Sequence, residues 1–255
     1  MSVSLTLSPA PATTFRLLGL FSFEREGGAP PRPMWPKPSA LLALLLVADG
    51  PVTLERIAAE LWGDRRPESA VANIRGYIGI LRRGFGGGAV RTLPGSYELA
   101  LPGALLDSDA FLDLLDRAED AGSPGEREEL LGRALALWHG PALAGLTHGP
   151  VLESWVERMN GHRRRATLQL AELSLAGGRY GRAQDLLRQH LVGHPTDESA
   201  YQLLMRALHE AGDSSAALVV YQRANRRLVD HGLLPGPRLR GTQQAILNHR
   251  PLPPC

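Results

Sequence analysis

The chain has 255 residues, enough for one large domain or two ordinary ones, and its hydrophobic content of 44% is typical of a globular protein. Its one cysteine, Cys255, excludes a disulfide framework within the chain and the cysteine pairs of a zinc site. The N-terminus lacks a secretory signal, and the longest apolar run, Ala40–Ala48, is too short to span a bilayer. We therefore expect a cytoplasmic protein with no membrane partner.

The small net charge of +2 is unevenly distributed. Residues 1–105 hold 11 Arg or Lys against 8 Asp or Glu, whereas residues 106–255 hold 17 against 18. The stretch Arg65–Leu99 alone contains six arginines and two acidic residues. Because a local basic patch attracts phosphate groups whatever the overall charge, this stretch is the part of the chain suited to nucleic acid.

The N-terminal part is predicted to combine strands and helices. A disordered Ser/Thr/Pro tail covers residues 1–14, and the Gly/Pro-rich loop Gly27–Pro38 holds one further short strand at Met34–Trp35. Ser39 and Thr53 are placed to cap helices. The other expected elements are a strand over Phe15–Phe23, helices over Ala40–Ala48, Leu54–Trp62 and Glu68–Arg83, and a hairpin of Val90–Leu93 and Ser96–Leu101 turning at Pro94-Gly95. A basic helix followed at once by a hairpin is the arrangement of a winged helix.

The remainder is predicted to be helical throughout. Ser123 and Glu126 form a capping box with proline at the first helical position. A period of 34 residues relates Ala183 to Ala217, which is the period of tetratricopeptide repeats (TPRs). Two repeats need neighbouring helices to complete the stack. The expected helices are Asp109–Ala121, Pro124–Trp138, Val151–Ala176, Arg179–Val192, Asp197–Ala211, Ser214–Asp230 and Arg238–Asn248.

These elements predict an N-terminal α+β winged helix-turn-helix domain followed by an all-α, TPR-like domain. The expected boundaries are a tail over 1–14, a DNA-binding domain over 15–105, a helical domain over 106–250 and a tail over 251–255. Such a protein would be cytoplasmic and associated with the nucleoid.

The third expected helix supplies the candidates for reading bases, because Asn pairs with adenine and Arg with guanine in the major groove. These candidates are Asn73, Arg75, Gly76 and Gly79. The candidates for phosphate contacts are Arg65, Arg66, Arg82, Arg83 and Arg91. The two glycines weaken a helix. They indicate a close approach to DNA, a helix that orders on binding, or tolerated substitution.

Signals for catalysis, a cofactor or a metal are poor. The chain has no phosphate-binding GxxxxGK loop and no GxSxG nucleophile elbow. His190 and His194 have metal-ligand spacing but no third ligand in view, so we expect them to cap a helix C-terminus. We expect a protein that is not an enzyme and needs no cofactor or metal.

Several longer motifs resemble those of the Streptomyces antibiotic regulatory proteins (SARPs), and the resemblance covers about residues 15–250. In the first part they are LWG at Leu61–Gly63, A-x6-Y-I-x2-L-R-R at Ala70–Arg83 and RTLPGSYEL at Arg91–Leu99. In the second part they are DSDAF at Asp107–Phe111, ALALWHGPALAGL at Ala134–Leu146 and GLLPGPRLR at Gly232–Arg240. Gly76 and Gly79 depart from the family, where polar side chains are more usual.

The resemblance implies a winged helix of the OmpR/PhoB kind and a bacterial transcriptional activation domain. It further implies activation of an antibiotic or other secondary-metabolite gene cluster. Family members bind direct repeats in double-stranded DNA as head-to-tail homodimers and contact RNA polymerase, including its sigma factor. Control by ATP or by receiver phosphorylation is not expected. The alternative is a TPR-like interaction adaptor whose basic segment binds an acidic protein.

Overall fold

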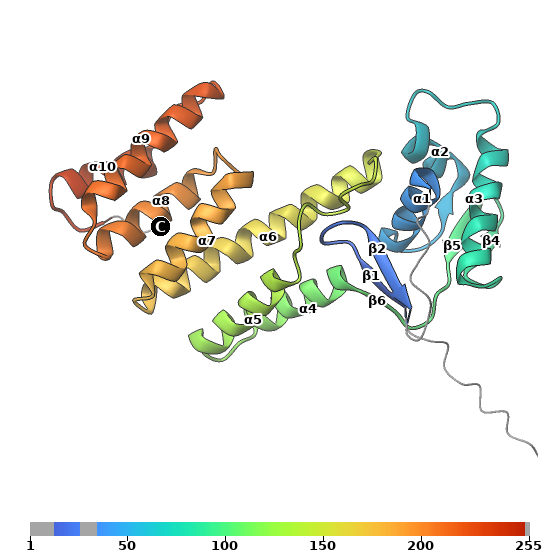
Figure 1. Cartoon of the computed structure of the whole chain (residues 1–255), viewed down its shortest axis with the longest axis horizontal. Helices are drawn as coiled ribbons and strands as arrows, with labels where there is room; N and C mark the ends of the chain where they lie inside the picture. The colour runs from blue at the N-terminus through green and yellow to red at the C-terminus, as the bar shows by residue number, and fades with distance from the viewer. Residues whose placement is uncertain (1–12, 26–34, 253–255) are drawn as a thin grey trace, which may run out of the picture. The chain divides into compact units, whose positions relative to one another are not determined.

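The computed structural model describes residues 13–25 and 35–252 (Figure 1). Most of the expected N-terminal tail lies outside the described residues, although Thr13 and Thr14 form part of a strand. Met34 and the last three residues also lie outside them. Trp35, expected at the end of a short strand, is not in a strand.

Internal contacts divide the chain into two compact units. The first comprises the residues up to Leu112 together with Ala136–Asn160. The second comprises Asp113–Leu135 together with the residues from Gly161 onward. The expected boundary between residues 105 and 106 therefore does not coincide with a boundary between packing units, because a segment of the helical part packs with the N-terminal residues.

The first sheet has three strands in the order β2-β1-β6. Their bounds are Thr13–Arg16 for β1, Ser22–Arg25 for β2 and Ala104–Leu106 for β6. β1 pairs antiparallel with β2, placing Phe15 opposite Phe23, and parallel with β6, placing Phe15 opposite Leu106. The rings of Phe15 and Phe23 also contact Phe85, so this sheet packs against the end of the third helix.

The expected single strand Phe15–Phe23 is wrong, because the chain turns back between β1 and β2. The backbone N–H groups of Leu17 and Leu18 donate to the carboxylate of Asp107 at 2.8 and 3.1 Å. Burial raises the pKa of Asp107 even though these bonds act in the opposite direction. The apolar run itself carries no sign of the turn, since the carboxylate lies 90 and 89 residues away in sequence.

Three helices follow, with bounds Pro36–Val47 for α1, Leu54–Trp62 for α2 and Ala70–Phe85 for α3. α1 begins before the expected start because proline is well suited to the first helical turn. The expected cap of α2 is confirmed, as the hydroxyl of Thr53 accepts a hydrogen bond from the N–H of Arg56 at 3.2 Å. α3 continues through Gly84 to Phe85 and is capped by Gly86, whose φ of 105° residues other than glycine rarely adopt.

The second sheet has the strand order β3-β5-β4. Its strands are Val52–Thr53 (β3), Val90–Leu93 (β4) and Ser96–Leu99 (β5). The expected β4–β5 hairpin is confirmed, and Gly95 at its turn has a φ of 68°, which a type II turn requires. β3 and β6 were not expected, because two or three residues are too few to show a strand period.

The segment Ala136–Asn160 is built into the first unit through backbone hydrogen bonds. The N–H of His139 donates to Leu18 O at 2.8 Å, and that of Leu143 donates to Leu17 O at 2.8 Å. The ring of Trp138 meets that of Phe111 edge-on, with centroids 5.5 Å apart. The turn between β1 and β2 is thus held by residues far along the chain.

Seven helices make up the rest of the described chain. Their bounds are Asp107–Glu119 (α4), Pro124–Ala136 (α5), Pro150–Ala176 (α6), Tyr180–Gly193 (α7), Glu198–Glu210 (α8), Ser214–Asp230 (α9) and Pro237–Leu247 (α10). The start of α5 confirms the capping box: the N–H of Glu126 donates to Ser123 Oγ at 3.2 Å. The carboxylate of Glu126 reaches back to the N–H of Gly122, one residue before the expected partner.

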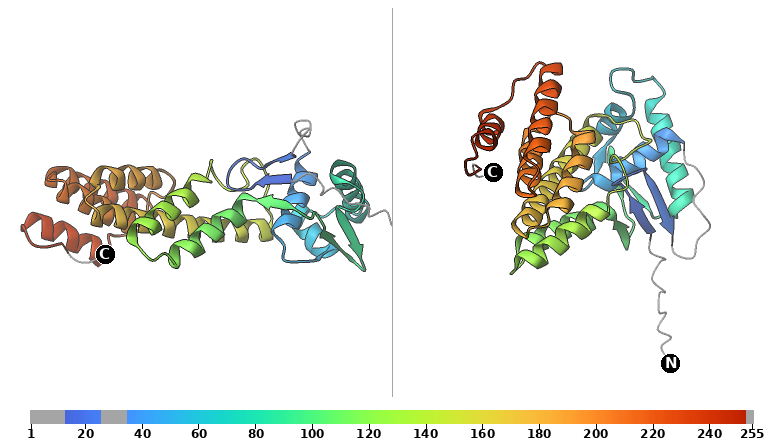
Figure 2. Two further views of the ribbon diagram at one scale, coloured as in Figure 1. Left: turned by 90° about the horizontal axis from the view of Figure 1, so that it is seen from below. Right: turned by 60° about the vertical axis from the view of Figure 1, so that its left-hand side comes forward.

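The 34-residue period corresponds to equivalent structural positions within the second unit. Ala183 and Ala217 are both fully buried, in α7 and α9. Gly178 and Gly212 have φ values of 70° and 90° just before these helices begin. α8 packs beside both α7 and α9 (Figure 2), and its alanines and leucines fill the core between them. Among the described residues, no helix is both long enough and apolar enough to cross a membrane.

Candidate nucleic-acid interface

One side of α3 is committed to the protein core and the other is open. Ala70, Ile74, Ile78 and Leu81 are buried, which follows from their helical spacing. The opposite side, the loop before the helix and the β4–β5 hairpin carry exposed arginines. We call this area the basic surface, and its arginines are Arg65, Arg66, Arg75, Arg83 and Arg91.

Arg75 is the expected base-reading side chain with the clearest outward position. It is exposed on α3 and makes no hydrogen bond or ion pair with the described residues. Asn73 is half-buried, and its side-chain amide donates to Ser69 Oγ at 3.2 Å. The amide has a second N–H and its carbonyl oxygen left, the two groups that a bidentate contact to adenine uses.

The structure offers no packing reason for the glycines of α3. A Cβ at Gly76 would meet no atom within 4 Å, and one at Gly79 would meet only Arg83 Nη1 at 3.5 Å. Both residues lie inside the continuous helix. Packing among the described residues therefore does not require glycine at either position.

Arg82 faces the protein rather than solvent. Its Nε and Nη2 donate to Val90 O at 3.1 and 2.8 Å, and Nη2 also donates to Thr92 Oγ1 at 2.6 Å. The guanidinium thus ties the last turns of α3 to β4. Arg83, the next residue, is exposed.

Arg91 lies on the hairpin with 68% of its side chain exposed. Its Nη1 is 3.6 Å from the carboxylate of Glu98 on the neighbouring strand. An ion pair this exposed contributes little to stability, so Arg91 remains available to an external anion. Arg65 and Arg66 are exposed in the loop before α3.

A stack of side chains joins the three helices beside the basic surface. Lys37 Nζ donates to Leu61 O at 2.7 Å and lies 4.7 Å from the centre of the Trp62 ring. That ring stacks on Tyr77 of α3, with centroids 6.4 Å apart. Burial lowers the pKa of Lys37. The sequence spacing gives no sign of this stack.

Sequence reasoning also missed Glu60 of α2, which is only 5% exposed. Its carboxylate accepts hydrogen bonds from the N–H groups of Gly149, Val151 and Leu152 at 2.7, 2.8 and 3.2 Å. These groups lie at the start of α6, where N–H groups lack partners within the helix. A Cβ at Gly149 would be 2.4 Å from Glu60 O, so glycine is required there.

The two spaced histidines lie at the C-terminal end of α7, as expected: His194 is the C-cap residue, and its N–H donates to His190 O. His190 also joins a hydrogen-bonded network. His190 Nε2 lies 2.8 Å from Asp197 Oδ2, and Arg164 holds both oxygens of the same carboxylate at 2.6 and 2.8 Å. Burial opposes ionisation of Asp197, but the bonds from His190 and Arg164 outweigh it and keep its pKa well below the usual range. Burial lowers the pKa of His194, whose ring stacks on that of His190. Across residues 13–25 and 35–252, no three His, Cys, Asp or Glu side chains are grouped to hold a metal.

Comparison with known proteins supports a regulatory role. The protein-family model called bacterial transcriptional activator domain matches residues 106–247. Regulatory protein AfsR of Streptomyces coelicolor is 34% identical over 222 residues, which cover 85% of this chain and 22% of AfsR. The chain thus spans about a fifth of the length of this relative.

Two further similar proteins are matched over more of their own length. Regulatory protein DnrI of Streptomyces peucetius is 30% identical over 242 residues, which cover 89% of each protein. The solved structure of Mycobacterium tuberculosis EmbR in complex with a low-affinity phosphopeptide is similar with a TM-score of 0.81 and 27% identity. That similarity covers 96% of this chain and 66% of the EmbR chain. The chain therefore belongs to the SARP family of transcriptional regulators, with a bacterial transcriptional activator domain over residues 106–247.

Proposed function

We propose that the chain is a sequence-specific DNA-binding activator of a secondary-metabolite gene cluster. In this proposal, residues 15–105 act as an OmpR/PhoB-like winged helix. α3 enters the major groove and the β4–β5 hairpin meets the flanking backbone. The observation that carries the proposal is the basic surface, where arginines from a helix and an adjacent hairpin are exposed on elements tied together by Arg82.

The proposed DNA contacts differ according to whether each side chain already bonds to other parts of the protein. Arg75 and Asn73 read base edges, while the backbone at Gly76 and Gly79 comes close to the groove. Arg65, Arg66, Arg83 and Arg91 contact phosphates and set the register on the duplex. Arg82 contributes chiefly by positioning the hairpin against α3, because its guanidinium already bonds to Val90 and Thr92. Only its remaining N–H groups could reach a phosphate.

The partners proposed for the helical part follow from the family. Residues 106–250 form a TPR-like domain that supports head-to-tail dimers on direct repeats and contacts RNA polymerase, including its sigma factor. Exposed apolar side chains at the end of α9 and just after it favour a protein contact there: Val229, Leu233 and Leu234 are 52%, 49% and 78% exposed. The same side chains would serve the alternative, a TPR-like adaptor.

A gel-shift experiment separates the two proposals. The probe is the DNA upstream of the chain's own gene, at ~150 mM salt, with a shuffled fragment of equal length as the control. An activator binds the upstream fragment about a thousandfold or more tightly than the shuffled one. No shift on either fragment, together with tight binding to an acidic protein, would favour the adaptor.

A further inference from the structure

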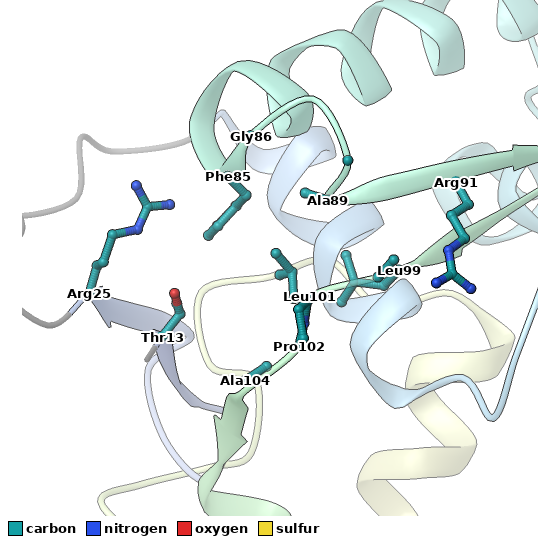
Figure 3. Close-up of a pocket in the computed structure, with 12 residues that line it drawn as sticks. Thr13, Arg25, Phe85, Gly86, Ala89, Arg91, Leu99, Leu101, Pro102 and Ala104 are labelled. Atoms are coloured by element: carbon teal, nitrogen blue, oxygen red, sulfur yellow. The ribbon is translucent and has the colours of Figure 1, made fainter. Parts of the chain in front are cut away.

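A pocket of about 750 Å³ opens beside the C-terminal end of α3 (Figure 3). Its walls come from β1 and β2, the last residue of α3, the loop that enters β4, the β4–β5 hairpin at Arg91 and Leu99, and the segment from Ala100 to Ala104. All of these segments belong to the first unit. The volume lies within the range of pockets that hold small organic molecules.

The pocket is apolar in the middle and basic at both ends. Figure 3 shows Phe85, Leu99 and Leu101 between Arg25 on one side and Arg91 on the other. Neither Asp nor Glu occurs among the described residues that line it. Such a lining favours a ligand with an apolar body and a negative charge, because a guanidinium makes charge-assisted hydrogen bonds to an anion.

Arg25 is fixed in place at its end of the pocket. One terminal nitrogen donates to Gly84 O at 2.8 Å, and the guanidinium lies 5.6 Å from the centre of the Phe85 ring. A guanidinium has five N–H donors, so others remain for a ligand. The side chain is half-buried, which strengthens any charge-assisted hydrogen bond it makes.

We propose that this pocket binds a small amphipathic organic anion, with a ring system against Phe85 and Leu101 and an acidic group on Arg25. Arg91, at the other end, is also one of the proposed phosphate contacts. A ligand that fills the pocket from Arg25 to Arg91 would therefore hinder a DNA phosphate from reaching Arg91, a consequence that rests on the proposed function.

The test uses 8-anilinonaphthalene-1-sulfonate, a fluorescent aromatic anion, with the full chain and no DNA. N-phenyl-1-naphthylamine, which has the same ring body without the sulfonate, is the matched neutral probe. We expect saturable one-site binding of the anion, at least about tenfold tighter than the neutral probe, since one charge-assisted hydrogen bond is worth that much. Equal binding of the two probes, or no saturable binding, would overturn the proposal.

Two variants locate the site. Arg25→Gln removes the charge, and Leu101→Glu places a carboxylate against the apolar wall; each should weaken the anion about tenfold or more. The controls are Arg16→Gln, at an exposed arginine outside the pocket, and Leu101→Met, which keeps the volume; both should bind as the parent does. Unchanged binding in both Arg25→Gln and Leu101→Glu would overturn the site even if the anion binds elsewhere. Thermal unfolding of each variant shows whether it is folded.

A second titration adds the upstream DNA. The anion should raise the apparent Kd for DNA in the parent protein and leave it unchanged in Arg25→Gln. No effect in the parent would refute competition at Arg91. Failure of the parent to bind DNA at all would count against the proposed function, whereas the DNA-free titration would still decide the pocket.

Discussion

Two sets of charged side chains in the first unit behave in opposite ways. The carboxylates of Glu60 and Asp107 are surrounded by backbone N–H groups of this chain, with bonds of 2.7–3.2 Å. Arg75 and Arg83 are exposed and make no hydrogen bond or ion pair with the described residues. A charge satisfied within the chain holds the fold together, whereas an exposed and unsatisfied one is available to a partner. The comparison predicts which substitutions change stability and which change binding.

The largest effect is expected for Glu60→Ala. This change leaves the N–H groups of Gly149, Val151 and Leu152 without their acceptor in a buried site, at a cost of about 3–5 kcal/mol in the free energy of unfolding. Urea unfolding followed by circular dichroism measures it. Glu55→Ala, on an exposed site of the same helix, should cost about 1 kcal/mol or less. Equal losses for the two variants would show that the carboxylate of Glu60 is not what holds α6.

Arg75→Ala should act on DNA binding alone. Loss of a bidentate contact to guanine weakens binding to the upstream site by about 1–3 kcal/mol, with little change on shuffled DNA and none in stability. Fluorescence anisotropy on both fragments measures the difference, with Arg188→Ala, exposed on α7, as the control. The base-reading role is excluded if the two fragments lose affinity equally.

Arg82 and Arg83 are adjacent arginines with different predicted roles. Arg82→Ala removes the bonds to Val90 and Thr92 and should lower stability by about 1–2 kcal/mol. Arg83→Ala should leave stability unchanged, because it makes no bond within the described chain. Thermal unfolding of the two variants checks this, and a smaller loss for Arg82→Ala than for Arg83→Ala would contradict the assignment.

Arg91→Ala should have the smallest effect of the four. It removes one phosphate contact, so binding to upstream and shuffled DNA weakens alike and the slope of log K against log salt falls by about one unit. Anisotropy titrations at four salt concentrations give the slope. An unchanged slope would mean that Arg91 does not contact a phosphate.

Local chemistry explains what could be predicted from the sequence. The starts of α2 and α5 depend on Thr53 and Ser123, and the hairpin turn depends on Gly95, all of which act within a few residues. The outward position of Arg75 follows from helical spacing alone. Such features need no knowledge of the rest of the chain.

The features that could not be predicted depend on distant partners. Glu60 accepts hydrogen bonds from residues 89–92 positions away. Nothing in the sequence of its own helix distinguishes it from an exposed glutamate. The β1–β2 turn needs Asp107 in the same way. The prediction of Arg82 as a phosphate contact gives no sign of its bonds to β4, which Val90 and Thr92 accept. For Glu60 and Arg82 the residue spacing predicts the helix but not the long-range hydrogen bond, and for β1 and β2 it predicts neither the turn nor the bond to Asp107.

Hydrogen–deuterium exchange with and without the upstream DNA fragment tests the central claim most directly. We predict slower exchange in the loop at Arg65, in α3 and in the β4–β5 hairpin, with α7 and α8 unchanged by a single bound protomer. Protection of the same segments by shuffled DNA should disappear as salt rises, since that binding is electrostatic. If the upstream fragment protects other parts of the chain and leaves α3 and the hairpin unprotected, the basic surface is not the DNA interface.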